Sequence, residues 1–108
     1  MALLICGAVL APAPSASLAA DSDAELAMGR RLFTAEATPA CAVCHTLNDA
    51  GATGEIGPSL DLLRPDAPRI DKALRNGVGV MPAFRERLSE AQIQALVRYV
   101  STVAGRTP

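Results

Sequence analysis

The sequence predicts a small all-α domain. Three stretches place apolar residues at helical spacing, and no stretch of useful length alternates apolar and polar residues like a half-buried strand. Two loops rich in Gly, Pro, Asn and Asp, at residues 47–60 and 77–84, separate these stretches. Loops on a rigid scaffold often carry function, so we expect part of the chemistry to lie there.

The chain opens with an uncharged block. All ten Lys and Arg and all eleven Asp and Glu follow residue 20. The apolar run at residues 2–11 has the length of a signal-peptide core and is too short to span a bilayer, although no basic residue precedes it. We therefore expect residues 1–20 to be a cleaved export signal and residues 21–108 to be the mature domain. An uncleaved anchor and an ordinary buried segment are the alternatives.

The first helix is predicted to begin at Ser22. Ser22 and Glu25 have the spacing of a capping box, in which each side chain satisfies a free backbone N–H of the first turn. Leu26, Gly29 and Phe33 then follow at helical spacing. The pattern indicates an amphipathic helix.

A shorter helix is predicted at residues 68–76. Asp66 or Ala67 would precede it, and Gly77 after Asn76 is a typical helix end. Its inward-facing residues would be Ile70, Ala73 and Leu74.

The last helix is predicted to begin after Ser89, which forms a second capping box with Gln92. Gly105 and Pro108 lie beyond its end. One face is apolar and consists of Ile93, Leu96, Val97, Val100 and Val103.

The composition indicates a thin core. The chain has two Phe, one Tyr and no Trp, and a domain of this size buries little apolar surface. We expect a bound group to complete the core. The net charge of −1 suggests neither nucleic acid nor an anionic membrane surface as a partner.

The stretch Cys41-Ala-Val-Cys44-His45 holds two of the three cysteines and the only histidine. Cys-x-x-Cys-His is the attachment pattern of c-type haem, in which each thiol adds to a vinyl group and the imidazole faces the iron. A redox dithiol would favour a βαβ setting, which is absent here, and structural zinc needs four ligands where the mature chain offers three. A plain disulfide or free thiols remain the simplest alternative. We predict one covalently bound haem c, which would also fill the core.

His45 would supply one axial ligand to the iron. The opposite position could take Met81, Met28, water or nothing. Met81 lies in a Gly- and Pro-punctuated loop, and Pro82 after it favours an extended Met81 and removes a backbone donor. Met28 lies within the first helix, where core packing is the simpler explanation. We predict His45 and Met81 as the ligands, a pair suited to one-electron transfer.

These features resemble the class I monohaem cytochromes c of bacterial periplasms. The resemblance rests on the Cys-x-x-Cys-His stretch, on the segment containing Gly57 and Pro58, and on the Met-Pro segment at Met81. It implies three or four helices around the haem, with the Pro58 carbonyl accepting a hydrogen bond from the His45 ring. It also implies that the first and last helices cross nearly at right angles, with Gly29 and Phe33 against Leu96 and Tyr99.

Three segments, at residues 29–47, 54–66 and 76–84, are similar to the cytochromes that accept electrons from periplasmic molybdenum-containing sulfite dehydrogenases. This resemblance implies a periplasmic electron carrier, not an enzyme, that passes electrons to a downstream cytochrome or oxidase. One alternative is a small-molecule-binding or peroxidase-like haem protein with a displaceable Met81. Another is a thiol–disulfide protein without haem.

The electron is expected to leave at the haem edge near the thioether bonds. Scattered charge predicts a transient complex with redox proteins. We also expect no membrane insertion of the mature chain. Residues expected to rim the edge are Ala42, Val43, Pro82 and Ala83. Candidates for pairing with the haem propionates are Arg64, Arg69 and Lys72, although a solvated surface is the simpler explanation for each.

Overall fold

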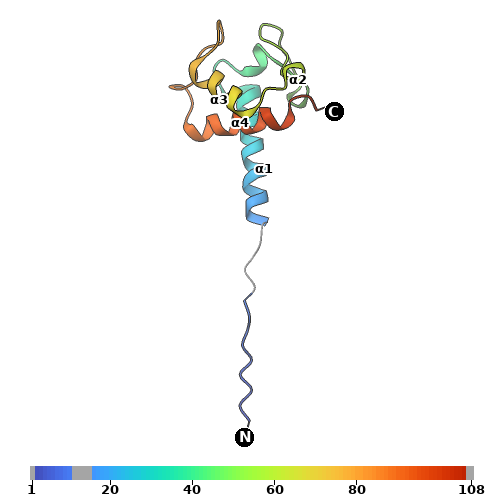
Figure 1. The fold of residues 1–108 in the computed structure, drawn as a ribbon, viewed down its shortest axis with the longest axis vertical. Coiled ribbons are helices and arrows are strands. Elements are labelled where there is room, and N and C mark those ends of the chain that lie inside the picture. Colours follow the sequence, from blue (N-terminus) through green and yellow to red (C-terminus); the bar gives the residue numbers. More distant parts are fainter. Residues whose placement is uncertain (1, 11–15, 107–108) are drawn as a thin grey trace.

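The computed structural model describes residues 2–10 and 16–106, and its globular part is built from helices (Figure 1). The prediction of an all-α domain is confirmed. No helix in the described part is both long and apolar enough to cross a membrane. The α-helices are α1 (Ala16–Arg31), α2 (Leu60–Leu63), α3 (Ala67–Asn76) and α4 (Glu90–Val103). Shorter helices are η1 (Leu32–Glu36), η2 (Cys41–Val43) and η3 (Asn48–Ala50).

The first and last helices cross at the centre of the core. Figure 1 shows α1 nearly perpendicular to α4. Gly29 allows this close approach, because a Cβ atom there would overlap the Ala95 carbonyl and the Tyr99 side chain. Phe33 packs edge-on against the Tyr99 ring, with centroids 6.1 Å apart and an angle of 64° between the rings. The predicted crossing of the two helices is confirmed, and Ala95 and Tyr99 are the residues of α4 that lie against Gly29.

The predicted start of α1 at Ser22 is wrong, because α1 begins at Ala16. Residues 16–20 include three alanines and a leucine, which are good helix formers and extend the helix upstream. The Ser22 hydroxyl accepts a hydrogen bond from Arg98 of α4 at 2.5 Å, and Glu25 lies 3.4 Å from the same guanidinium. These two side chains therefore connect α1 to α4.

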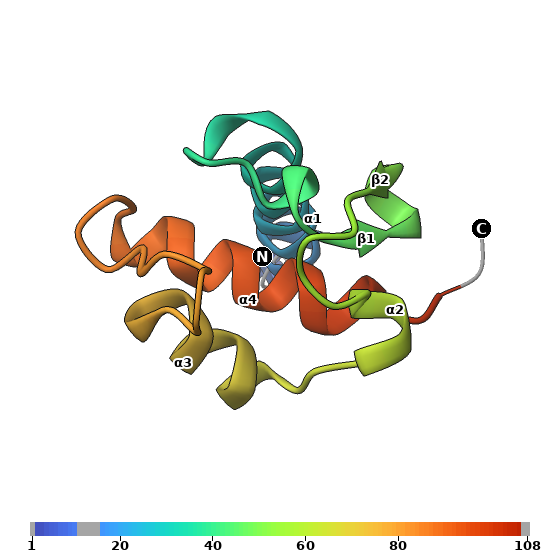
Figure 2. The ribbon, with the colours of Figure 1, turned by 90° about the horizontal axis from the view of Figure 1, so that it is seen from above.

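The other two predicted helices have the expected ends. The Asp66 side chain caps α3, and Gly77, at φ +70°, follows its last residue. Ser89 and Gln92 form the capping box of α4. Seen from above, α2 and α3 lie along one side of α4, and η1 lies along the other (Figure 2). Buried side chains on these faces are Ile70, Leu74, Ile93, Leu96, Val97, Val100 and Val103.

The loop at residues 47–60 contains regular structure that the sequence did not predict. Strand β1 (Thr46–Leu47) pairs antiparallel with β2 (Ala52–Thr53). Gly51, at φ +63°, makes the turn between η3 and β2. Strands of two residues are too short to show alternation in the sequence.

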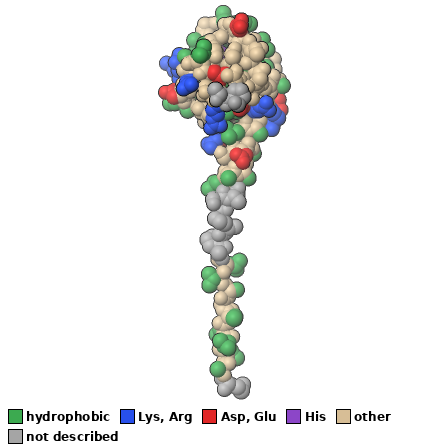
Figure 3. All heavy atoms as spheres, turned by 90° about the vertical axis from the view of Figure 1, so that its right-hand side faces the viewer, with side chains coloured by type: hydrophobic (Ala, Val, Ile, Leu, Met, Phe, Trp, Pro, Cys, Tyr) green, Lys and Arg blue, Asp and Glu red, His purple; other side chains and the backbone are tan. Residues whose placement is uncertain are grey.

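Residues 2–10 and 16–20 of the predicted export signal lie within the described part of the chain. Residues 1 and 11–15, like Pro108 at the other end, fall outside the described residues. Residues 2–10 are exposed and extend away from the body as a narrow column (Figure 3). On the face shown in Figure 3, basic and acidic side chains are scattered over both flanks of the body.

Candidate functional site

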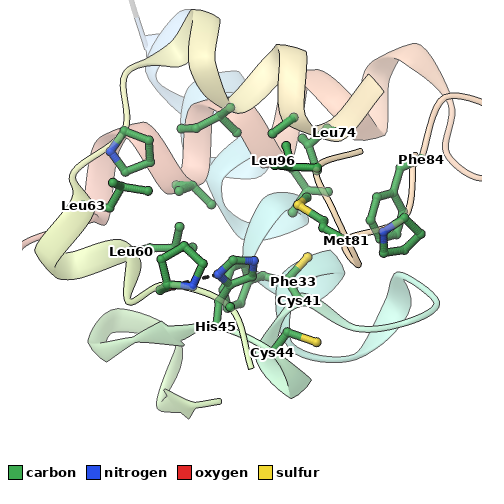
Figure 4. Close-up of a pocket in the computed structure, with 18 of the residues that line it drawn as sticks. Phe33, Cys41, Cys44, His45, Leu60, Leu63, Leu74, Met81, Phe84 and Leu96 are labelled. Atoms are coloured by element: carbon green, nitrogen blue, oxygen red, sulfur yellow. Dashed lines mark hydrogen bonds between the residues drawn. The ribbon is translucent and has the colours of Figure 1, made fainter. Parts of the chain in front are cut away.

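A cavity of about 310 Å³ opens at the centre of the domain. Its wall is mostly apolar, which suits a flat apolar group. Figure 4 shows side chains from several elements converging on it. The helical segments contribute Phe33, Leu60, Ile70, Leu74, Leu96 and Val100.

Cys41, Cys44 and His45 all line this cavity. The backbone N–H groups of Cys44 and His45 both donate to the Cys41 carbonyl, at 3.1 and 2.9 Å. This tight turn brings two thiols and an imidazole to one wall (Figure 4). Burial raises the pKa of the Cys41 thiol to about 11, so this thiol is protonated at neutral pH.

The His45 ring is held in one orientation. Its Nδ1 donates to the Pro58 carbonyl at 2.8 Å. Because a carbonyl only accepts, Nδ1 carries the proton and Nε2 keeps its lone pair. Gly57 backs the ring, since a Cβ atom there would lie 2.6 Å from His45 Cε1. His45 can therefore offer Nε2 to a metal.

Met81 reaches the same cavity from the loop between α3 and α4. The loop forms a tight hairpin, in which Met81 N donates to the Val78 carbonyl at 2.9 Å and Val78 N donates to the Met81 carbonyl at 3.1 Å. Gly79 at its tip has φ +55°, a backbone conformation that favours glycine. The hairpin thus places a thioether in a cavity that also contains an imidazole.

Among the three candidate propionate partners, only Arg69 lines the cavity. Arg69 belongs to the first turn of α3 and is exposed at its side chain. The Arg64 side chain lies beside Gly105 instead, and Lys72 is exposed outside the cavity. Met28 also lies outside the cavity and packs partly buried against the core.

The predicted rim is partly exposed and partly buried. Val43 is 60% exposed and Ala83 is exposed, whereas Ala42 and Pro82 are half-buried. Sequence reasoning missed three further apolar residues that line the cavity and reach the surface: Ile56, Val78 and Val80. Each of the three residues is next to a glycine in the sequence. This neighbour marks a loop but does not predict that the side chain lines a cavity.

The chain matches known proteins over most of its length. Residues 24–100 match the family described as cytochrome c oxidase, cbb3-type, subunit III. Cytochrome c6 of Bryopsis maxima is 31% identical over 86 residues, covering 70% of this chain and 89% of that protein. The chain belongs to the c-type cytochromes.

Two further relatives support the assignment of this chain to the c-type cytochromes. Cytochrome c6 of Leptolyngbya boryana is 33% identical over 81 residues, covering 71% of this chain and 91% of that protein. The crystal structure of the c-type cytochrome SorU from Sinorhizobium meliloti is 52% identical, with a TM-score of 0.74, over 78% of this chain and 95% of that chain.

The cytochrome therefore binds haem c covalently and serves electron transfer. Its cavity fits that group. Cys41 and Cys44 stand in the Cys-x-x-Cys-His position, an imidazole lone pair is available, and a thioether and apolar walls complete the surroundings.

Proposed function

We propose that the cytochrome is a periplasmic one-electron carrier whose haem is attached to Cys41 and Cys44 and ligated by His45 and Met81. One observation carries this proposal: an imidazole with a free Nε2 and a thioether line the same apolar cavity, although they come from segments far apart in the sequence. Haem iron, when bound, supplies reversible one-electron chemistry, and Met ligation raises its potential relative to two nitrogen ligands.

The chain's own residues would keep this centre rigid and dry. The Pro58 carbonyl holds the imidazole and increases its basicity, while Gly57 leaves room for the ring. Leu74 and Leu96, both nearly inaccessible to solvent, belong to the apolar wall. A wall of this kind excludes water, and low solvent access is one of the factors that set a haem potential.

Arg69 is the proposed partner of a haem propionate. It carries the only permanent charge among the described residues that line the cavity. Its backbone N–H donates to the Asp66 carboxylate at 2.9 Å, and this fixes the start of α3 without using the guanidinium. The guanidinium is a charged donor that matches carboxylate geometry.

The exposed apolar residues at the cavity mouth are the proposed docking surface for redox partners. Ile56, Val78 and Val80 line the cavity and are each more than half exposed. Val43, which is 60% exposed, lies between the two cysteines of the cavity wall. Small, weak interfaces of this kind suit transient electron transfer. We propose a molybdenum-containing sulfite dehydrogenase as donor, on the resemblance of residues 29–47, 54–66 and 76–84, and a downstream cytochrome or oxidase as acceptor.

The axial pair is tested by an optical and redox titration of holoprotein made with a c-type maturation system. The proposal expects a low-spin wild type, and a Met81→Ala variant that turns high-spin or falls sharply in potential. Met28→Ala is the matched control, because it removes a thioether that lies outside the cavity. A high-spin wild type, or an unchanged Met81→Ala spectrum, would favour the small-molecule-binding or peroxidase-like alternative.

The donor is tested by stopped-flow reduction of the oxidised protein with a sulfite dehydrogenase and sulfite. Fast reduction that Val80→Asp slows would support both the donor and the docking surface. Reduction no faster than by sulfite alone would contradict the donor. Export is tested by sequencing the N-terminus of the periplasmic protein, which we expect to begin near Asp21.

A further inference from the structure

Two segments beside His45 run in register. Gly57 N donates to the Cys44 carbonyl at 2.7 Å, and His45 Nδ1 donates to the Pro58 carbonyl at 2.8 Å. A third bond joins Asn48 N to the Asp61 carboxylate at 2.8 Å. The partners in all three bonds are 13 residues apart, so the segments 44–48 and 57–61 form one ladder. The His45–Pro58 bond is its middle rung.

Asp61 closes the far end of this ladder and ties it to the core. Its Oδ2 accepts from Asn48 N, and its Oδ1 accepts from Gly105 N at 2.8 Å, just beyond the end of α4. A single carboxylate therefore joins the His45 segment, α2 and the C-terminal end of α4. Since α4 crosses α1 in the core, the ladder is fixed to the most buried part of the fold.

A second contact holds the same loop on α4. The Tyr99 hydroxyl donates to the Asp49 carboxylate at 2.6 Å, one residue after Asn48. The loop after His45 is thus attached at two consecutive residues. Asp61 adds a third link between the two ladder segments at the end away from Cys44, and it also ties them to the backbone N–H of Gly105 beyond α4. It therefore fixes their register at that end.

We propose that Asp61 is a positioning residue for the axial imidazole: by fixing the register of segments 44–48 and 57–61, it sets the His45–Pro58 hydrogen bond and so lowers the reduction potential. This inference rests on the proposed role of His45 as a ligand. A shorter bond to Nδ1–H makes the imidazole a stronger donor and stabilises the oxidised iron. Releasing the ladder should weaken that bond and raise the potential.

Asp61→Glu tests the proposal in the holoprotein, because it keeps the charge but moves the carboxylate away from both amides. We expect a higher reduction potential than wild type. We also expect the His45 ring N–H to exchange faster with solvent, as measured by NMR of the reduced protein. Asn48→Pro is a second variant, which deletes the N–H donor of the last rung and leaves Asp61 in place. Proline suits this position because Asn48 is the first residue of η3 and Leu47 before it is extended.

Glu55→Gln is the control for charge. Glu55 lies exposed just before the ladder segment, and none of the hydrogen bonds or ion pairs between the described residues uses its side chain. If Asp61→Glu and Asn48→Pro leave potential and ring exchange at wild-type values, Asp61 is only structural and the proposal is wrong. The proposal is also wrong if Glu55→Gln, which removes a charge without touching the ladder, speeds the exchange of the ring N–H as much as they do. Failure of the Met81 assignment would appear separately in the spin state, and the ring N–H exchange would still decide the role of Asp61.

Discussion

The two sides of the cavity are held in different ways. On the His45 side, the ring is bonded to Pro58 at 2.8 Å and pressed against Gly57. On the Met81 side, a hairpin is closed by two backbone bonds to Val78, and its tip at Val80 is 89% exposed. Few buried contacts and exposed backbone bonds mark a segment of low local stability. The Met81 side should therefore open before the His45 side when the protein is stressed.

Breaking the rigid side should have the largest effect. In Gly57→Val, side-chain atoms would occupy the space of the His45 ring, so the imidazole could not keep its position. We expect most of the holoprotein to be lost, measured as covalent haem per expressed chain. Gly51→Ala is the control in the same region, because Gly51 has φ +63° and open space around it. It should cost ~1 kcal/mol of stability and keep the haem spectrum. Equal yields for both variants would contradict the role of Gly57.

Breaking the softer side should have a smaller effect. Gly77→Ala introduces a Cβ 2.6 Å from the Met81 carbonyl at φ +70°, so the hairpin must shift. We expect a mixture of low-spin and high-spin haem, and a free energy of unfolding lower by ~2 kcal/mol. Gly79 also has a positive φ, +55°, but a Cβ atom there meets nothing within 4 Å, so Gly79→Ala should stay low-spin. A wholly low-spin Gly77→Ala would show that the hairpin tolerates the shift.

Loosening the loop after His45 should be milder still. Tyr99→Phe deletes the hydrogen bond to Asp49, which should lower the free energy of unfolding by ~1 kcal/mol. Burial, then the bond to Asp49, raises the pKa of Tyr99 well above its ordinary value of 10.0. A group whose pKa is higher in the folded protein than in the unfolded chain stabilises the fold fully at any pH below its unfolded pKa. This stabilisation is lost as the pH rises from the unfolded pKa toward the folded pKa. Urea titrations should therefore show wild type losing stability above about pH 10, and Tyr99→Phe losing less.

The smallest expected effect concerns charge at the cavity mouth. Arg69→Gln removes the only permanent charge among the described residues that line the cavity. Losing a positive charge favours the oxidised iron, so the reduction potential should fall. We expect a fall of roughly 30 mV, about half of the 59 mV that corresponds to a tenfold change in a one-electron equilibrium. Lys72→Gln removes an equal charge from the same helix outside the cavity and should shift the potential less. Equal shifts in the two variants would exclude direct pairing of Arg69 with a propionate.

Much of this site follows from short stretches of sequence. The Cys-x-x-Cys-His stretch, the Met81-Pro82 pair and the Ser89–Gln92 capping box each act within a few residues, so the sequence alone predicts their chemistry. The caps of α3 and α4 and the helix crossing at Gly29 agree with those local signals. The start of α1 differs from the prediction, because a capping pattern does not reveal whether the residues before it are helical too.

The sequence by itself determined the all-α class, the haem attachment stretch and the candidate donors, because residue type and local spacing carry that information. Only the tertiary structure decided which arginine lines the cavity, which valines reach its mouth, and that Asp61 and Tyr99 hold the loop after His45. These contacts join residues at least 13 positions apart. Which of these residues meet depends on how the helices pack against one another, and no local sequence pattern encodes that packing.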